Sequence, residues 1–324
     1  MSALRAGFGL LLLAVAACVA VATLLPLSAS NAWWVRMWEF PRLHLLVLAL
    51  AVLVLLRFVW RPLRAATFLA MIATVLWQGW WAWPYAPWAA EQVEVTDGDG
   101  GAVLLALNVL QGNDDTAAVR DYLDRVDADL VLLMETDRRW AEALEPVLSR
   151  YPTRAERIAD DHYGMILATR LPAARAELVD LGYESAPHPA PIAVAELEID
   201  GRPIVFTGLH PFPPVPQSSR AERDRQTAIA ARLARIDGVP AVAMGDFNDV
   251  AWSRSSQLFR DHGDYLDPRA GRGILASFSA RSRILRVPID QGLVTDGIEV
   301  QAFEIGPDVG SDHFPILLRV SPER

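Results

Sequence analysis

The sequence predicts an α/β protein in which two packed, mixed β-sheets are flanked by helices and preceded by N-terminal transmembrane helices. The 324 residues are 52% hydrophobic yet carry a net charge of −9, a combination that a uniformly soluble chain rarely shows. The first 90 residues hold six arginines and one glutamate, a charge of +5, so the remainder carries −14. Beyond residue 101, about nine short apolar segments are interrupted by few helical ones. An apolar, basic anchor therefore precedes an acidic body.

Residues 1–90 are expected to form a membrane anchor with about three transmembrane helices, at 7–27, 38–60 and 65–88. The first stretch has 21 uncharged residues, about the length that crosses a bilayer core of roughly 30 Å. A cleaved signal peptide is the alternative, but the stretch ends in Leu-Pro-Leu instead of a small-x-small site. The last stretch ends in a tryptophan cluster typical of a membrane interface. The middle one has only 14 uncharged residues, so its span depends on flanking aromatic residues and on Arg42 and Arg57, which can snorkel.

The arginines between these stretches predict the orientation of the anchor. Three spans with the N-terminus inside leave four arginines in the cytoplasm and two outside, which satisfies the positive-inside rule. These are Arg5, Arg57, Arg61 and Arg64 against Arg36 and Arg42. The expected protein is a multi-pass protein of the cytoplasmic (inner) membrane with its body on the extracytoplasmic side. If the middle stretch does not span, the body lies in the cytoplasm.

A polar linker at 91–101 leads to the second domain, 102–324. Its expected strands are 102–110, 130–134, 165–169, 192–199, 203–209, 239–244, 289–294, 298–305 and 315–320, with helices at 114–126 and 219–236. So many strands with few helices exceed one βαβ sheet and indicate two packed sheets with helices outside. The single cysteine, Cys18, lies in the anchor, which excludes a disulfide framework or a cysteine metal site in the body.

Polar residues stand at the ends of several of these strands. They are Asn108, Glu135, His210, Asp246, Asn248, Asp290, Asp312 and His313. Side chains at strand ends can meet at one edge of a sheet, and carboxylates that converge there repel one another unless a divalent cation holds them. Oxygen ligands without cysteine favour Mg²⁺ or Mn²⁺. Taken singly, each residue also has a structural explanation: Asn108 could form an Asx-turn, and Glu135 could pair with Arg138 or Arg139.

The order of the motifs makes the set specific. The series N-V-L, V-L-L-M-E, G-L-H, G-D-F-N, P-I-D and G-S-D-H-F-P-I, within residues 103–320, resembles the endonuclease/exonuclease/phosphatase superfamily of metal-dependent phosphodiesterases. The anchor and the H-P-x-P-P sequence at 210–214 resemble a membrane-anchored bacterial subgroup of that superfamily. The resemblance implies a four-layer α/β sandwich, with the site where the strand ends of the two sheets meet, and makes 102–324 the catalytic domain.

The resemblance also implies roles for the polar residues. Glu135 would be the main metal ligand, assisted by Asn108 and Asp312. Asp246 and Asn248 would position the attacking water and the scissile phosphate. His313, oriented by Asp290, would be the general base or a phosphate contact, and its role could be exchanged with that of Asp246. His210 would stabilise the transition state or protonate the leaving oxygen.

Two positions depart from the pattern of the superfamily. Gln291 stands where many members have histidine, and Ala276-Ser277-Phe278 replaces a threonine-tryptophan pair. The first departure puts the local network around Asp290 in question, and the second does so for the wall on the substrate side.

The expected function is a membrane-anchored, Mg²⁺-dependent phosphoesterase that hydrolyses a phosphodiester, either a lipid or another ester of the cell envelope. A membrane-tethered nuclease acting on DNA or RNA is the first alternative, and a catalytically silent binding or sensor module is the second. A charge of −14 counts against nucleic acid, whose binding is driven by cationic surface. Local exceptions are Arg220, Arg223, Arg225, Arg232 and Arg235 on one helix, and Arg281, Arg283 and Arg286 before Asp290. The bilayer and a phosphoester are the expected partners, and no obligate protein partner is inferred.

Overall fold

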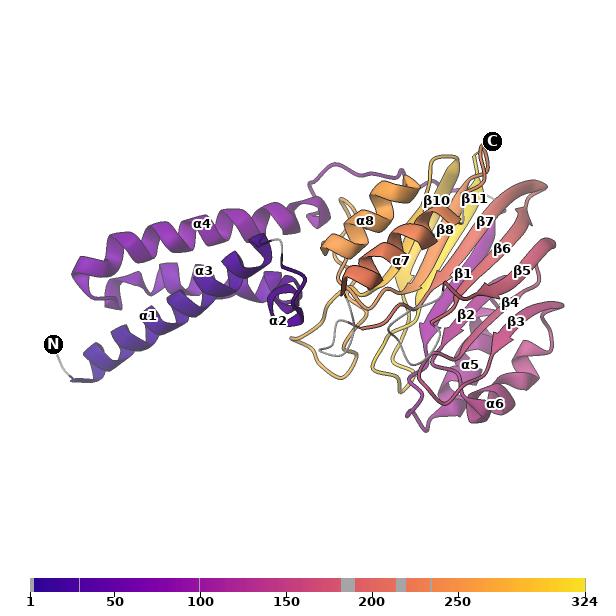
Figure 1. Ribbon diagram of the computed structural model, residues 1–324, viewed down its shortest axis with the longest axis horizontal. Coiled ribbons are helices and arrows are strands. Elements are labelled where there is room, and N and C mark those ends of the chain that lie inside the picture. The colour runs from indigo at the N-terminus through magenta and orange to yellow at the C-terminus, as the bar shows by residue number, and fades with distance from the viewer. Residues whose placement is uncertain are drawn as a thin grey trace. The chain divides into compact units, whose positions relative to one another are not determined.

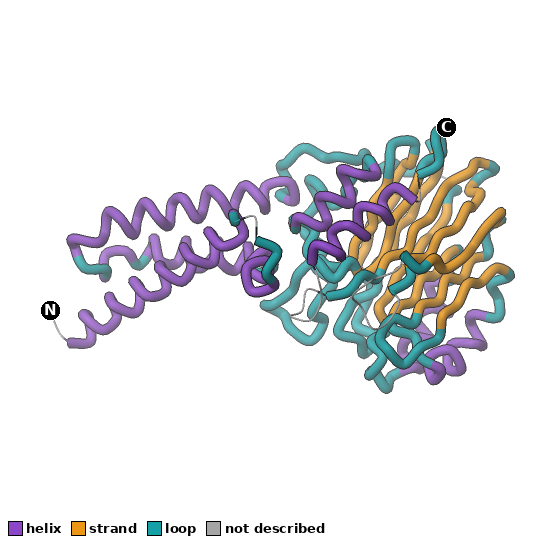
Figure 2. The backbone as a smooth tube through the Cα atoms, in the orientation of Figure 1, coloured by secondary structure: helices purple, strands orange, loops and turns teal. Residues whose placement is uncertain are grey.

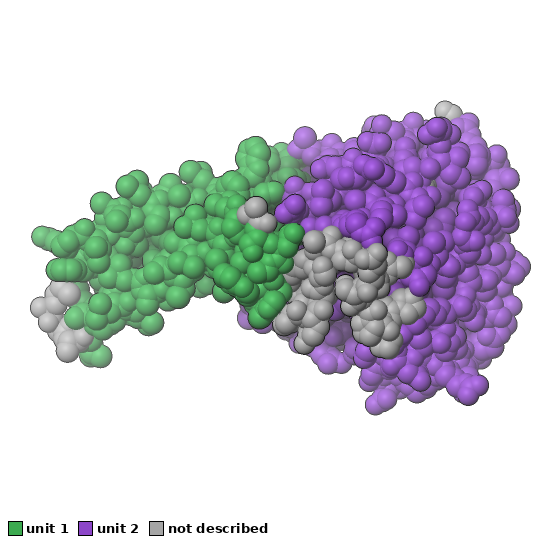
Figure 3. Space-filling view, in the orientation of Figure 1, with its two compact units in different colours: residues 1–89 green, residues 90–324 purple. Residues whose placement is uncertain are grey.

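The computed structural model describes residues 3–28, 30–98, 100–181, 190–213, 220–233 and 235–323. The chain divides into two compact units, Met1–Ala89 and Ala90–Arg324 (Figure 3). The predicted start of a helix at Ser219 and the proline at 214 lie outside the described residues.

The first unit is helical. Its elements are α1 (Ala3–Leu24), η1 (Leu25–Leu27), α2 (Trp33–Arg36), η2 (Met37–Glu39), α3 (Arg42–Val54), η3 (Leu56–Phe58), η4 (Arg61–Leu63), α4 (Arg64–Ala82) and η5 (Trp83–Tyr85). Ala16 and Val19 of α1, Ala49 of α3 and Met71 of α4 pack together in its core. By length and composition, Leu4–Leu27 and Arg61–Tyr85 are able to cross a membrane.

The middle stretch differs from the continuous helix that the sequence suggested. Trp33–Glu39 and Arg42–Val54 are two helical pieces at an angle of 71°, and they add a third span only if they act as one. Pro41 stands at the break, at the N-cap of α3, and proline cannot continue a helix because it lacks the N–H and clashes with the preceding turn. The 13 residues of α3 measure about 20 Å at 1.5 Å per residue, less than the roughly 30 Å of a bilayer core.

The second unit contains two mixed sheets (Figure 1). Sheet A has the order β10-β11-β1-β2-β4-β3, and sheet B has the order β5-β6-β7-β8-β9. The strands are β1 (Ala102–Asn108), β2 (Leu130–Met134), β3 (Thr153–Arg157), β4 (Met165–Thr169), β5 (Ala173–Val179), β6 (Ile192–Ile199), β7 (Arg202–Leu209), β8 (Ala241–Asp246), β9 (Asp290–Val294), β10 (Ile298–Ile305) and β11 (Ile316–Pro322). The helices are α5 (Thr116–Val126), α6 (Arg138–Leu148), α7 (Arg220–Leu233) and α8 (Arg254–Gly263).

The layers follow from which face of each strand is buried against which partner. Leu104 of β1 belongs to the core between the sheets, together with Phe206 of β7. The neighbouring Leu105 faces outward and packs with Trp140 of α6. Since β1 is covered on both faces, it reads as a continuous apolar run instead of an alternating one. On sheet B, α7 and α8 cover the outer face, where Phe259 joins the third core cluster. The result is the four-layer α/β sandwich that the resemblance implied (Figure 2).

Two strands, β3 and β5, were not anticipated. Both lie at the edge of a sheet, and neither sequence has the apolar pattern of the inner strands. The sequence of β3 is Thr-Arg-Ala-Glu-Arg, in which Arg154 and Glu156 are exposed, and β5 is rich in alanine. Edge strands carry charged and helix-favouring residues because only one of their sides pairs with a neighbour, so the hydrophobic pattern that identifies inner strands is weak there.

Candidate active site

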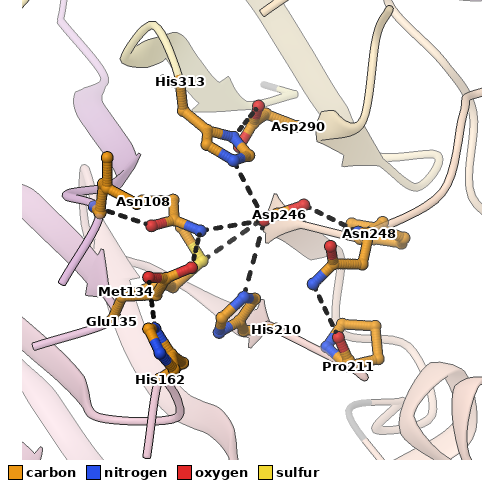
Figure 4. Close-up of polar contacts among 12 residues, drawn as sticks. Asn108, Met134, Glu135, His162, His210, Pro211, Asp246, Asn248, Asp290 and His313 are labelled. Carbon is orange, nitrogen blue, oxygen red and sulfur yellow. Dashed lines mark hydrogen bonds and ion pairs between the residues drawn. The ribbon is translucent and has the colours of Figure 1, made fainter. Parts of the chain in front are cut away.

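Four strands deliver their final residues to one edge of the sandwich (Figure 4). Asn108 ends β1, Glu135 follows β2, His210 follows β7 and Asp246 ends β8. The pair β1 and β2 is parallel, as is the pair β7 and β8, so the carboxyl ends of each pair lie at the same edge. Asp290 joins them because β9 runs antiparallel to β8 and pairs its first residue with Asp246.

The backbone at this edge is bent by residues with positive φ. Glu135 has φ of 63° and Asn248 has φ of 49°, a region that non-glycine residues seldom occupy except at functional turns. Gly245 has φ of 137°, and a Cβ there would lie 2.2 Å from the carbonyl oxygen of Leu209. The glycine of G-D-F-N is therefore required for β8 to pass close to the end of β7.

Glu135 is surrounded by hydrogen-bond donors. Its Oε1 accepts from Asn108 Nδ2 at 2.9 Å, and its Oε2 accepts from the backbone N–H of Gln111 at 3.0 Å. His162 Nδ1 lies 3.2 Å from the same Oε2. Burial acts to raise the pKa of Glu135, but the nearby His210 and these hydrogen bonds outweigh it and lower the pKa below its usual value. Glu135 is thus an ionised carboxylate at neutral pH.

The side chain of Asn108 connects the two sheets. Its Nδ2 donates to Glu135 and also to Asp246 Oδ2 at 3.1 Å, while its Oδ1 accepts from the backbone N–H of Leu110 at 3.0 Å. In this orientation the amide nitrogen faces the two carboxylates. Ligation of a metal through the oxygen of Asn108 requires a rotation of the amide that exchanges its two ends.

Asp246 is the centre of the site. Its Oδ2 lies 3.6 Å from His210 Nε2 and 3.6 Å from His313 Nε2, and its Oδ1 accepts from the backbone N–H of Asn248 at 2.8 Å. Its side chain is 1% exposed. Burial and the charge of Asp290 raise the pKa of Asp246 above its usual value, in spite of the two histidines.

His313 lies between two carboxylates. Its Nδ1 is 2.9 Å from Asp290 Oδ2, and its Nε2 faces Asp246. Burial acts to lower the pKa of His313, but the charges of Asp290 and Asp246 and the hydrogen bond to Asp290 raise it to about 10. At neutral pH the ring is therefore an imidazolium.

The structure brings most of the predicted residues into one network and leaves two at its margin. Asn108, Glu135, His210, Asp246, Asp290 and His313 are linked by the contacts described above. The side chain of Asn248 donates to the carbonyl oxygen of Pro211 at 2.9 Å and so holds the residue that follows His210. Asp312 reaches the network through Oδ1, 4.0 Å from His313 Nε2.

The charge of the site fits a divalent cation. Four carboxylates meet here, those of Glu135, Asp246, Asp290 and Asp312, and within the described part of the chain their ionic partners are histidines. A buried excess of negative charge is costly unless a cation compensates it. Of the four, Glu135 and Asp312 are the more open, with side chains 15% and 24% exposed, whereas Asp246 and Asp290 are buried.

A tighter group of potential ligands also exists. Ligand atoms of Asp246, Asp290 and His313 lie within 4.8 Å of one another. In this group, however, both ring nitrogens of His313 are already directed at the two carboxylates. The protonated imidazole thus occupies the position between them that an ion would take, and Glu135 remains the better candidate for the ligand.

Reasoning from the sequence missed His162 and Tyr163. His162 contacts Glu135, and the ring of Tyr163 lies 5.5 Å from that of His210 and 4.5 Å from that of Phe212. Arg157 holds their loop by binding Asp161 at 2.6 and 3.0 Å. The available signal was the dense polar sequence Asp-Asp-His-Tyr-Gly just before β4.

Three further residues have roles other than those considered from the sequence. Arg223 is buried and binds Asp249 at 3.2 Å and the carbonyl oxygen of Phe247 at 2.9 Å, so it holds the G-D-F-N turn instead of facing a substrate. Gln291, the first departure, donates to the Asp249 carbonyl oxygen and to Ser256. Ser277 belongs to the second departure, Ala276-Ser277-Phe278, and its Oγ accepts a hydrogen bond from the backbone N–H of Asp290 at 3.2 Å. Gln291 and Ser277, the residues at the two departures, thus form hydrogen bonds that hold the segments around the site.

Comparisons with known proteins agree with this architecture. The sequence profile described as the Endonuclease/Exonuclease/phosphatase family matches residues 105–313. No curated protein matches the sequence. Among solved structures, an endonuclease/exonuclease/phosphatase from Bacteroides vulgatus is 17% identical, with a TM-score of 0.58 over 69% of this chain and 100% of that one.

Two other similar structures carry more specific names. TDP2 of D. rerio, complexed with a single-strand DNA product, is 14% identical, with a TM-score of 0.56 over 69% of this chain and 100% of that one. A mannosyl-6-phosphatase of Bacteroides thetaiotaomicron is 16% identical, with a TM-score of 0.52 over 68% of this chain and 99% of that one. At these identities the likeness concerns the fold.

Proposed function

Because the chain belongs to the Endonuclease/Exonuclease/phosphatase family, whose members hydrolyse phosphoester bonds with divalent metal ions, we propose that it cleaves a phosphodiester at the site of Figure 4. The proposal assigns residues 102–324 to catalysis and the helices of residues 1–90 to anchoring in a membrane. The observation that supports it most directly is the position of the Asp246 carboxylate between His210 and His313, each 3.6 Å away.

Asp246 is the proposed general base. Its Oδ1 accepts from the backbone N–H of Asn248. Its Oδ2, which accepts from Asn108 and faces the two histidines, is the oxygen proposed to take a proton from the attacking water. A base works best when its pKa lies near the working pH, and burial moves the pKa of Asp246 upward in that direction. His313, with a pKa of about 10, already holds a proton and is a poor base. The sequence left open whether Asp246 or His313 is the general base, and we assign that role to Asp246.

The two histidines then serve the phosphate. His313 keeps its proton through Asp290 and offers positive charge to a non-bridging oxygen, where negative charge grows during the reaction. His210 is buried with its Nε2 3.6 Å from Asp246 Oδ2, and no described residue is hydrogen-bonded to its Nδ1; this ring is proposed to serve the phosphate or the leaving oxygen. The side-chain amide of Asn248, which donates to the Pro211 carbonyl oxygen, is proposed to contact the phosphate as well.

The cofactor is proposed to be Mg²⁺ or Mn²⁺, held by Glu135 with help from Asn108 and Asp312. When bound, the ion supplies positive charge to the phosphate oxygens and so reduces their repulsion of the nucleophile. Oxygen donors of this kind suit a hard divalent ion.

The proposed substrate is a lipid phosphodiester or another ester located at a membrane. The body carries −14, which opposes the approach of nucleic acid, whereas Leu4–Leu27 and Arg61–Tyr85 are able to hold the chain in a bilayer. If Trp33–Glu39 and Arg42–Val54 act as one span, the arginine count from the sequence favours a body outside the cytoplasm; with two spans and the N-terminus inside, the body lies in the cytoplasm. Nuclease activity is the second candidate, because the similar TDP2 structure was solved with a DNA product.

The test is hydrolysis by the purified full chain. Bis(p-nitrophenyl) phosphate, phospholipid vesicles and plasmid DNA are each incubated with Mg²⁺ or with EDTA. We expect metal-dependent hydrolysis of the first two, loss of it in Asp246→Asn and His313→Ala, and normal rates in Asp296→Asn, a control on an exposed acid. Activity that persists in both site variants would exclude the mechanism, and hydrolysis of DNA alone would select the second candidate.

A further inference from the structure

The segment between Phe278 and Val287 exposes two adjacent aliphatic side chains. Ile284 is 79% exposed and Leu285 is 64% exposed, the highest values among the large hydrophobic residues that the structure describes in the body. Burying such a side chain stabilises a folded protein because apolar surface is removed from water. Two neighbouring side chains that forgo this gain are a feature in need of a function.

The segment is an ordered loop with internal hydrogen bonds. Ser282 Oγ accepts from the backbone N–H groups of Ile284 at 3.2 Å and Leu285 at 2.9 Å, which holds both residues at the tip. Arg286 Nε donates to the Ser282 carbonyl oxygen at 2.7 Å. At the base, Phe278 and Val287 exchange backbone hydrogen bonds. The exposure of the two aliphatic side chains is therefore a property of a defined turn.

The loop is basic in an otherwise acidic body. Residues 279–286 read Ser-Ala-Arg-Ser-Arg-Ile-Leu-Arg and contain no acid. Arg281 and Arg283 are exposed, and Arg286 lies with its guanidinium 4.7 Å from the ring of Phe314. None of the three makes an ion pair with a described residue, whereas Arg154, Arg157, Arg170 and Arg175 in the same body all do.

The base of the loop is joined to the active site. The ring of Phe278 lies 4.8 Å from that of His313, and the backbone N–H of Ala280 donates to the Asp312 carbonyl oxygen at 2.7 Å. Phe314 donates its backbone N–H to the Ser277 carbonyl oxygen. Whatever binds the loop is consequently held beside the proposed catalytic histidine.

We propose that residues 279–286 are the surface by which the body contacts an anionic lipid bilayer. Aliphatic tips enter the boundary between headgroups and acyl chains, and arginines bind lipid phosphates. Nucleic acid would account for the arginines but leaves the aliphatic pair unexplained. The inference rests on the proposed function, which it deepens: the substrate is a phosphoester at the surface of that bilayer. The helices able to cross a membrane bring the same chain to such a surface.

The first test measures the depth of the loop in a bilayer. Cys18 is the single cysteine, so Cys18→Ser gives a background in which Leu285→Cys carries one spin label. Leu233→Cys, at a residue that is 53% exposed, is the matched control. The full chain is reconstituted in vesicles of phosphatidylcholine with or without phosphatidylglycerol, and collisions with oxygen and with a water-soluble nickel chelate are measured by electron paramagnetic resonance.

We expect the label at 285 to be accessible to oxygen and shielded from nickel in the anionic vesicles, and the label at 233 to be open to nickel in both. Replacing two arginines, in Arg281→Gln with Arg283→Gln, should weaken the binding of the loop to anionic vesicles, relative to its binding to vesicles of phosphatidylcholine alone, by roughly fivefold per charge. Equal nickel access at 285 and 233 in both vesicles would overturn the proposal, whether or not the chain hydrolyses any substrate.

The second test links the loop to turnover. Ile284→Ser with Leu285→Ser should reduce hydrolysis of a vesicle-embedded phospholipid tenfold or more and leave hydrolysis of soluble bis(p-nitrophenyl) phosphate unchanged. Leu233→Ser with Ile236→Ser is the control and should change neither. Unchanged vesicle hydrolysis in the loop variant would contradict the proposal. Inactivity of the wild-type chain on both substrates would instead contradict the proposed function, while the depth measurement still decides the surface.

Discussion

His313 and Asp290 form a buried pair in which the ring Nδ1 lies 2.9 Å from the carboxylate Oδ2. Because Asp290 begins β9 and His313 precedes β11, the pair joins the two sheets. It determines both the orientation of the ring and the protonation of its far nitrogen, which faces Asp246. In the proposed mechanism, the charge of Asp290 therefore acts on the phosphate through His313.

Asp290→Asn should separate the charge of this pair from its geometry. The amide can still accept from Nδ1, but it no longer raises the pKa of His313, so we expect that pKa to fall and turnover to drop about 10²-fold, within the range for general acid–base groups. Histidine titration by NMR and steady-state kinetics measure the two effects. Asp296→Asn is the control, and an unchanged His313 pKa in Asp290→Asn would refute the role assigned to Asp290.

The same pair predicts how stability depends on pH. The folded-state pKa of His313, about 10, is raised above the unfolded value of about 6.5. Its contribution to stability is thus complete below about pH 6.5 and disappears as the pH rises through about 10. Denaturation of the metal-free protein at pH 6, 8 and 10 should show wild type losing stability with rising pH more steeply than His313→Gln. Parallel curves would contradict this prediction.

Glu135→Gln should abolish tight metal binding. The variant keeps the size of the side chain and removes its charge, so we expect Mn²⁺ affinity by titration calorimetry, and Mg²⁺-dependent turnover, to fall at least 10²-fold. Glu142→Gln, whose side chain is 73% exposed, should behave as wild type. Mn²⁺ binding retained in Glu135→Gln but lost in Asp246→Asn would move the metal to the group of Asp246, Asp290 and His313.

Arg223→Met should lower the stability of the fold and have little effect on substrate binding. Arg223 and Asp249 are 2% and 3% exposed, and removal of one member of a buried ion pair costs roughly 3–5 kcal/mol because the other charge remains. We expect a lower melting temperature and a lower kcat with little change in KM. Arg232→Met, at an exposed position on α7, is the control. A raised KM at unchanged stability would instead indicate that Arg223 contacts the substrate.

The inner strands and the residues at their ends were predictable because burial on both faces produces a strong pattern in the sequence. A strand buried on both faces must be apolar throughout, so Asn108, Glu135 and Asp246 stood out as the polar residues at which such runs stop. Edge strands such as β3 have no such contrast. His162 was missed because its approach to Glu135 depends on a loop held by Arg157 and Asp161, and no local pattern encodes that contact. The bend at Pro41 had a local signal, which the apolar composition of the stretch obscured.

Sheet A also constrains when the site can exist. Its β11 lies between β10 and β1, and Ala102 pairs with Val320 across almost the whole length of the body. Pairing of such distant segments is slow because a long loop must close first. His313 reaches Asp246 only when this closure has occurred. A chain still being synthesised therefore has no assembled catalytic centre, and the phosphoesters of the cell are not exposed to it until the body has folded.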